Sequence, residues 1–238
     1  MSAFLALALL PNLATAQDLS VNFGDNNTLT QRAIQLIGLM TVLSLAPSIL
    51  VMVTSFTRII VVLSLLRTAL GLQTSPPNSV MVSLALFLTA FIMAPTLQQS
   101  YQQGIAPLMA GQIQINDAFT RSAAPVEKFM LANVRKEDLQ LFYDLSNQPA
   151  PPDESAVPLQ LLVPAFMISE LRRAFEIGFL LFVPFVVIDM VVASVLMSMG
   201  MMMLPPVVIS LPFKLIFFVL VDGWHLVAGS LIRSFVSG

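Results

Sequence analysis

The sequence predicts an all-α protein of the integral-membrane type, built from helical hairpins with kinked helices. Of its 238 residues, 57% are hydrophobic and only 10% are charged, whereas about a quarter of the residues in an ordinary globular chain are charged. The mean hydropathy is +0.86. Apolar runs long enough for spanning helices occur in both halves of the chain. We therefore expect the chain to lie in a membrane or inside a larger apolar assembly.

The composition also excludes several function classes. The net charge is −2 and there is no basic run, so nothing favours nucleic acid as a partner. The chain has no cysteine, which excludes disulfides and thiol chemistry. It has one histidine, His225, which excludes a histidine-rich metal site within one chain. We expect neither a metal nor a cofactor.

The N-terminal segment 1–16 is typical of a secretory signal peptide. Its apolar part is short, and Ala14-Thr15-Ala16 forms a small-residue cleavage pattern before Gln17. The alternative is an apolar N-terminal helix that stays attached, since no Lys or Arg precedes the apolar part.

Residues 17–97 are interpreted as the first kinked helical hairpin. Its first helix lies in the uncharged stretch 33–57, which is longer than the about 20 residues that a span needs and is kinked at Pro47. A turn around Gly71 leads to a second apolar helix over 80–93, which Pro95 is expected to close.

Residues 98–158 form a polar insert with four basic and seven acidic residues, a net charge of −3. Ser122 is a candidate cap for an amphipathic helix over 125–145, followed by a proline-rich linker. The apolar side chains of the predicted helix fall near one face, so we expect that face to pack on a neighbouring subunit. They are Val126, Phe129, Met130, Val134, Leu141, Phe142 and Leu145.

Residues 159–238 are interpreted as a second long hairpin with a methionine-rich turn. As one helix, the 40-residue apolar stretch 159–198 would be about 60 Å long, twice a bilayer core, so it breaks near Pro184 or projects from the membrane plane. The turn at 197–206 contains Gly200 and Pro205-Pro206, after which apolar sequence resumes over 207–232. The methionines are either gap-filling residues of a helical hairpin or an adaptable apolar ring.

Isolated charges in apolar helices are candidates for function, and here they are Asp189, Lys214 and Asp222. A hairpin that turns at 201–202 brings Asp189 close to Lys214. Glu170 is an alternative partner for Lys214. A structural ion pair, an intersubunit pair and a proton relay all remain open as roles.

The positive-inside rule gives a provisional topology. It places Arg58 and Arg67 on the cytoplasmic side and the acidic insert on the periplasmic side. Arg172 and Arg173 conflict with this topology, although acidic neighbours at helical spacing could neutralise them.

No motif in the chain indicates an enzyme, and no residue is predicted to be catalytic. Asp189 and Asp222 lack the Tyr-Asp and Gly-x-Gly-Asp contexts of aspartyl intramembrane proteases, and no Ser/His/Asp grouping or phosphate loop occurs. A secondary transporter that uses Asp189, Lys214 and Asp222 as coupling charges is an alternative, but the inverted repeats typical of that class are not detected.

Several long motifs carry a resemblance to a known family. They are MVTSFTRII at 52–60, LRTALG at 66–71, EKFM at 127–130, SELRRAF at 169–175, the methionine turn, LPFKL at 211–215 and VDGW at 221–224. With them the chain resembles the FliP family of flagellar export-gate proteins, from about residue 36 to the C-terminus. The injectisome counterparts of the SctR type are similar, but the predicted signal peptide and the LPFKL and VDGW motifs look more flagellar.

The resemblance implies a subunit of the flagellar type III export gate, which passes unfolded rod, hook and filament subunits. It implies a helical ring complex, a homopentamer joined by FliQ and FliR and contacted by FlhA and FlhB. The location implied is the bacterial inner membrane, at the flagellar basal body within the MS ring. The implied pore constriction is Met199, Met201, Met202 and Met203. Apart from the resemblance, we assign Glu170, Arg173, Asp189, Lys214 and Asp222 as structural or intersubunit charges.

Overall fold

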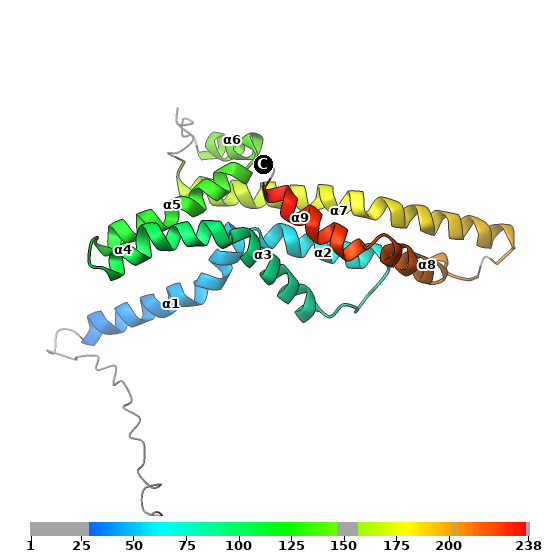
Figure 1. The fold of residues 1–238 in the computed structure, drawn as a ribbon, viewed down its shortest axis with the longest axis horizontal. Coiled ribbons are helices and arrows are strands. Elements are labelled where there is room, and N and C mark those ends of the chain that lie inside the picture. Colours follow the sequence, from blue (N-terminus) through cyan, green and yellow to red (C-terminus); the bar gives the residue numbers. More distant parts are fainter. Residues whose placement is uncertain (1–28, 147–156, 202, 237–238) are drawn as a thin grey trace, which may run out of the picture. The chain divides into compact units, whose positions relative to one another are not determined.

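The computed structural model of the chain describes residues 29–146, 157–201 and 203–236. Helices and connecting turns make up this described part, without a strand, so the all-α prediction is confirmed (Figure 1). The helices are α1 (Leu29–Val53), α2 (Phe56–Ala69), α3 (Asn78–Ser100), the π-helix η1 (Tyr101–Ile105), α4 (Ala106–Met109), α5 (Ile115–Asn133), α6 (Lys136–Ser146), α7 (Leu159–Ser198), α8 (Pro206–Leu220) and α9 (Gly223–Val236).

The chain divides into two compact units, residues 1–46 and 47–238. The boundary falls inside α1, at the proline for which a kink was predicted. The predicted signal peptide at 1–16 and most of the proline-rich linker lie outside the described residues. All features below belong to the second unit unless stated otherwise.

Helix α7 is the central element of the second unit, and α2 packs along it (Figure 1). It runs unbroken for 40 residues through Pro164 and Pro184, so the predicted break near Pro184 does not occur. Each proline removes one backbone donor, a loss that apolar helices tolerate when neighbouring helices pack against them. The core where these helices meet is aliphatic and aromatic. It contains Ile59, Val62, Leu63, Leu66, Met81, Ala85, Ala174, Phe185, Phe218, Val227 and Leu231.

Helix α3 packs on α2 and does not end at Pro95, where the sequence predicted its end. It passes through the π-helix η1 into α4, so 78–109 forms one apolar segment of 32 residues. The π-helix packs against α5 at Gly104, where a Cβ atom would lie only 1.9 Å from Ser122 Oγ and 2.5 Å from the Ala118 carbonyl oxygen. Glycine is therefore required at this helix crossing.

The insert contains two helices where the sequence predicted one over 125–145. Helix α5 begins ten residues earlier, so Pro125 lies inside it, and the chain becomes extended at Val134 before α6 starts. The apolar face around Phe129 and Met130 packs on Leu162 of the chain's own α7, where packing on a neighbouring subunit was predicted.

Within the described ranges, two helical segments are long and apolar enough to cross a membrane, 78–109 and α7. Counting each bent helix pair as one span raises this number to as many as four. Much of the apolar surface of these helices is exposed, including Phe87 and Phe91 on α3 and Phe179 and Met190 on α7. A single chain therefore leaves large apolar faces that require lipid or protein neighbours.

We predict that Gly104→Ala lowers the free energy of unfolding by about 1–3 kcal/mol, because its methyl group would overlap Ser122 Oγ and backbone atoms of α5. The matched control is Gly38→Ala in α1, where no atom lies within 4 Å of the new Cβ. There alanine should be neutral or stabilising by up to about 1 kcal/mol. Thermal unfolding of the purified chain in detergent measures the change in stability that each substitution causes. Equal effects of the two substitutions would contradict the close packing of η1 on α5.

Candidate functional site: the methionine turn and the buried charges

The methionine turn is a tightly defined connection between α7 and α8. The Gly200 N–H donates to the Met197 carbonyl and the Met201 N–H to the Leu196 carbonyl, at 3.1 and 3.0 Å. With Gly200 at a φ of +72°, these bonds form a Schellman motif that ends α7. Pro205 and Pro206 then start α8, since a proline at the first helical position has no N–H to leave unpaired. The end of α7 and the start of α8 are therefore each held by a specific backbone feature.

The methionine side chains of the turn point away from the core. Met199, Met201 and Met203 are 61%, 44% and 99% exposed. Met202, the fourth residue of the predicted constriction, lies outside the described residues. The alternative that these methionines fill gaps inside the hairpin does not account for the three that are described, because gap-filling side chains would be buried.

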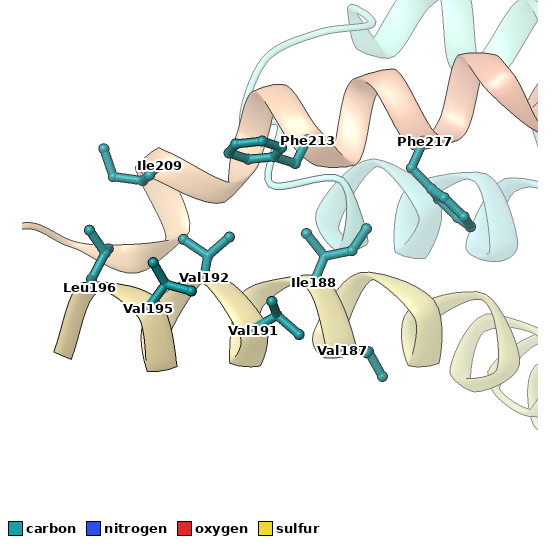
Figure 2. Close-up of a pocket in the computed structure, with 9 residues that line it drawn as sticks. All are labelled: Val187, Ile188, Val191, Val192, Val195, Leu196, Ile209, Phe213 and Phe217. Atoms are coloured by element: carbon teal, nitrogen blue, oxygen red, sulfur yellow. The ribbon is translucent and has the colours of Figure 1, made fainter. Parts of the chain in front are cut away.

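An apolar groove of about 570 Å³ runs between α7 and α8 on the side of the hairpin that leads to the turn. In Figure 2, Ile188 and Val192 of α7 face Phe213 of α8 across this groove. Its described lining is entirely aliphatic and aromatic, so the groove offers no group for polar chemistry. It adds to the apolar surface that the isolated chain leaves uncovered.

Arg58 of α2 and Glu170 of α7 form a salt bridge in which both side chains are 0% exposed. Arg58 Nε donates to Glu170 Oε2 at 2.8 Å, and Arg58 Nη2 donates to Oε1, so the contact is bidentate. Arg58 is therefore not the solvated charge that the positive-inside rule counts, and the predicted topology stays a prediction. The alternative pairing of Glu170 with Lys214 is absent within the chain.

Arg58 also joins the C-terminal helix to this pair. Its Nη1 donates to the carbonyl and hydroxyl oxygens of Ser234, at 3.1 and 3.0 Å. The Phe235 ring covers the guanidinium group, with 3.6 Å between Cζ and the ring centroid. Arg58 is thus the structurally central charge that sequence reasoning missed. Its position in an otherwise apolar run was the available signal.

Asp189 and Lys214 form the second ion pair, which the hairpin geometry predicted. Lys214 Nζ donates to Asp189 Oδ2 at 2.7 Å and to the Ala69 carbonyl at 3.2 Å. The Ser210 hydroxyl donates to the other carboxylate oxygen of Asp189. Ala69 is the last residue of α2, so Lys214 also satisfies a carbonyl that the helix end leaves free. This pair ties α8 to both α7 and α2.

Ser169, next to Glu170, fastens the insert to α7. Its hydroxyl accepts the Arg135 N–H at 3.0 Å and donates to Asp138 Oδ2 at 2.7 Å. Ser169 of α7 thus satisfies polar groups at the start of α6 that a helix beginning leaves unpaired. A separate helix can therefore begin there, which explains why the predicted single helix is divided in two. Further along α6, burial raises the pKa of the Tyr143 phenol.

The remaining predicted charges do not join these pairs. Arg173 is half-buried on α7, close to the Arg58–Glu170 pair. Asp222 is exposed in the bend between α8 and α9, at a φ of +50°. No group of three or more acidic or histidine side chains in the described ranges could hold a metal ion.

Comparison with known proteins shows the family of this chain. A model of the FliP family matches residues 39–231. The chain belongs to the FliP family. It is 62% identical to the flagellar biosynthetic protein FliP of Caulobacter vibrioides over 99% of this chain and 89% of that protein. It is 50% identical to FliP of Rhizobium meliloti over 98% of this chain and 97% of that protein. It is 54% identical to FliP of Bacillus subtilis over 85% of this chain and 91% of that protein.

Membership of the FliP family makes this chain a flagellar biosynthetic protein. A role in flagellar export fits this assignment, and the apolar helices fit a membrane location. The FliP family is not a known enzyme family.

We predict that Glu170→Leu lowers the free energy of unfolding by about 3–5 kcal/mol, because it leaves the Arg58 guanidinium buried without a counter-charge. The double replacement Arg58→Met with Glu170→Leu should recover most of that loss, since no uncompensated charge then remains. Denaturant unfolding of the purified chain measures these differences.

The matched control is the exposed Arg172–Glu176 pair on the same helix, whose Nε and Oε1 atoms are 3.1 Å apart. Its removal should change the free energy of unfolding by less than about 1 kcal/mol. A double replacement at Arg58 and Glu170 that is as destabilising as the sum of its two single replacements would contradict the coupling.

Proposed function

We propose that this chain is a pore-forming subunit of the flagellar type III export gate, which passes unfolded rod, hook and filament subunits. Five copies form a ring with FliQ and FliR, and FlhA and FlhB contact the assembled gate. The gate lies at the inner membrane, within the MS ring of the basal body. The observation that carries this proposal is the exposed methionine turn at the end of a rigid hairpin.

The turn has the physical properties that such a constriction needs. Its backbone is held by the Schellman motif and two prolines, while Met203 is 99% exposed. Flexible thioether side chains adapt to passing chains of varied shape. Several copies around one axis would form an apolar constriction, and such constrictions exclude water and ions by dewetting. The turn would thus seal between transits and yield during them.

The uncovered apolar faces support assembly with other chains. Helix α7 is about 60 Å long, twice the thickness of a bilayer core, so lipid alone cannot cover its exposed side. Neighbouring subunits would cover the rest, including the groove between α7 and α8. This fits a helix that projects from the membrane plane, which is one of the two alternatives that its length left open.

The alternatives have less support. In a secondary transporter, Asp189 and Lys214 would act as coupling charges, but here each fastens helices of one chain together. An injectisome subunit is less favoured because the curated relatives described above are flagellar biosynthetic proteins. The transporter alternative also leaves the exposed methionines without a role.

We predict that replacing Met199, Met201 and Met203 together by Ala increases ion leakage through the assembled complex while assembly is retained. The substitutions remove apolar bulk from the turn without adding charge and leave its backbone hydrogen bonds in place. Conductance of membranes that contain the complex measures leakage, and native gel electrophoresis measures assembly.

The matched control replaces Met52, Met109 and Met190, three exposed methionines outside the turn, by Ala. This control should assemble and remain sealed. Normal assembly with no added leak in the turn variant would make the methionines hairpin residues without a sealing role and would overturn the proposal.

A further inference from the structure

Helix α9 begins at a bend that departs from regular helix geometry. Its axis makes an angle of 63° with α8. Between the helices, Asp222 adopts a φ of +50°, a left-handed conformation that aspartate tolerates better than most residues. A Cβ atom on Gly223 would lie 2.2 Å from the Phe218 ring, so the two helices meet closely at this point. The bend is thus confined to three residues, 221–223.

The packing beside this bend is incomplete. A cavity of about 250 Å³ lies there, and its wall includes Leu66, Phe185, Phe218, Gly223 and Val227. The pocket is partly open to the outside of the chain, so the side of α9 that forms its wall is not packed against other helices as it would be in a filled core. The first turns of α9 therefore have room to move.

The far end of α9 is held by specific contacts. Ser234 accepts two hydrogen bonds from Arg58 Nη1, and the Phe235 ring lies against the guanidinium of the same residue. Phe235 also stacks on Phe129 of α5, with ring centroids 5.9 Å apart and 20° between the planes. Phe129 in turn contacts Phe166 of α7 edge to face. The end of α9 therefore connects the buried ion pair to the insert.

We propose that α9 is a hinged strap, with its hinge at 221–223 and its latch at Ser234 and Phe235. When the latch holds, the strap covers the Arg58–Glu170 pair and supports Phe129 of the insert. When the latch releases, α9 swings about the hinge, which uncovers the ion pair and removes one partner of the insert. The strap is a property of the single chain and does not depend on the proposed export function.

The chain has no cysteine, so one introduced cysteine is a unique reporter of strap opening. Leu231 lies on α9 and is completely buried, as is Ala85 on α3 in the same core. We would introduce Leu231→Cys or Ala85→Cys, each alone, into the full chain in its assembled complex. The rate of modification by a water-soluble maleimide then measures local opening at each position.

Weakening the latch with Ser234→Ala and Phe235→Ala removes the hydroxyl bond and the ring contact to Arg58 and leaves only the bond to the Ser234 carbonyl. It should accelerate modification of the cysteine at position 231 by about tenfold, because fewer contacts then hold the end of α9 closed. The cysteine at position 85 should react at an unchanged rate. The milder variant Phe235→Leu keeps most of the apolar bulk. It should also accelerate modification at position 231 more than at position 85, but by less than the double variant does.

Two outcomes would overturn the strap. Unchanged modification at position 231 in both latch variants would show that Ser234 and Phe235 do not hold α9 closed. Equal acceleration at positions 231 and 85 with the milder Phe235→Leu variant would show that the whole core opens, and that α9 does not move separately.

Discussion

Arg58 and Glu170 are separated by 112 positions in the chain, and both charges are removed completely from solvent. Burying such a pair costs free energy of desolvation unless every polar atom of both side chains has a hydrogen-bond partner. The neighbouring helices must therefore supply those partners. Arg58 meets this constraint with bidentate bonds to Glu170, two bonds to Ser234 and the face of Phe235. Ser169, beside Glu170, holds the start of α6. Helices α2, α7 and α9 and the insert therefore meet at one buried charged site.

The second half of α7 extends from this site with little covering of its own. The Asp189–Lys214 pair and the Ala69 carbonyl fix α8 against α7 and α2, so the hairpin keeps its register despite its exposed apolar faces. The Schellman motif at Gly200 then presents the methionine side chains at the hairpin end. Polar contacts thus hold the hairpin in place, while its outer surface stays apolar for neighbours to cover.

The features that depend on nearby residues were predictable from the sequence. The methionine turn and the Asp189–Lys214 pair follow from a single hairpin, whose turn determines which residues face each other. The Arg58–Glu170 pair was not predictable, because distant segments supply its two charges and a topology rule treats Arg58 as solvated. A helix end at Pro95 was predicted from local propensity, and a break near Pro184 was one of two alternatives, but tertiary packing carries both helices through. The division of the insert depends on Ser169 of α7, which local sequence cannot indicate.

In the proposed gate, the methionine turns of several copies converge on one axis. A single cysteine at Met203, the most exposed methionine of the turn, tests this claim directly because the native chain has no thiol. With a short bifunctional maleimide, the assembled complex should give covalent multimers of the Met203→Cys chain and none of a Met109→Cys chain, although Met109 is also well exposed. Absence of multimers for Met203→Cys in intact complexes would show that the turns do not meet, and the account of a shared constriction would be wrong.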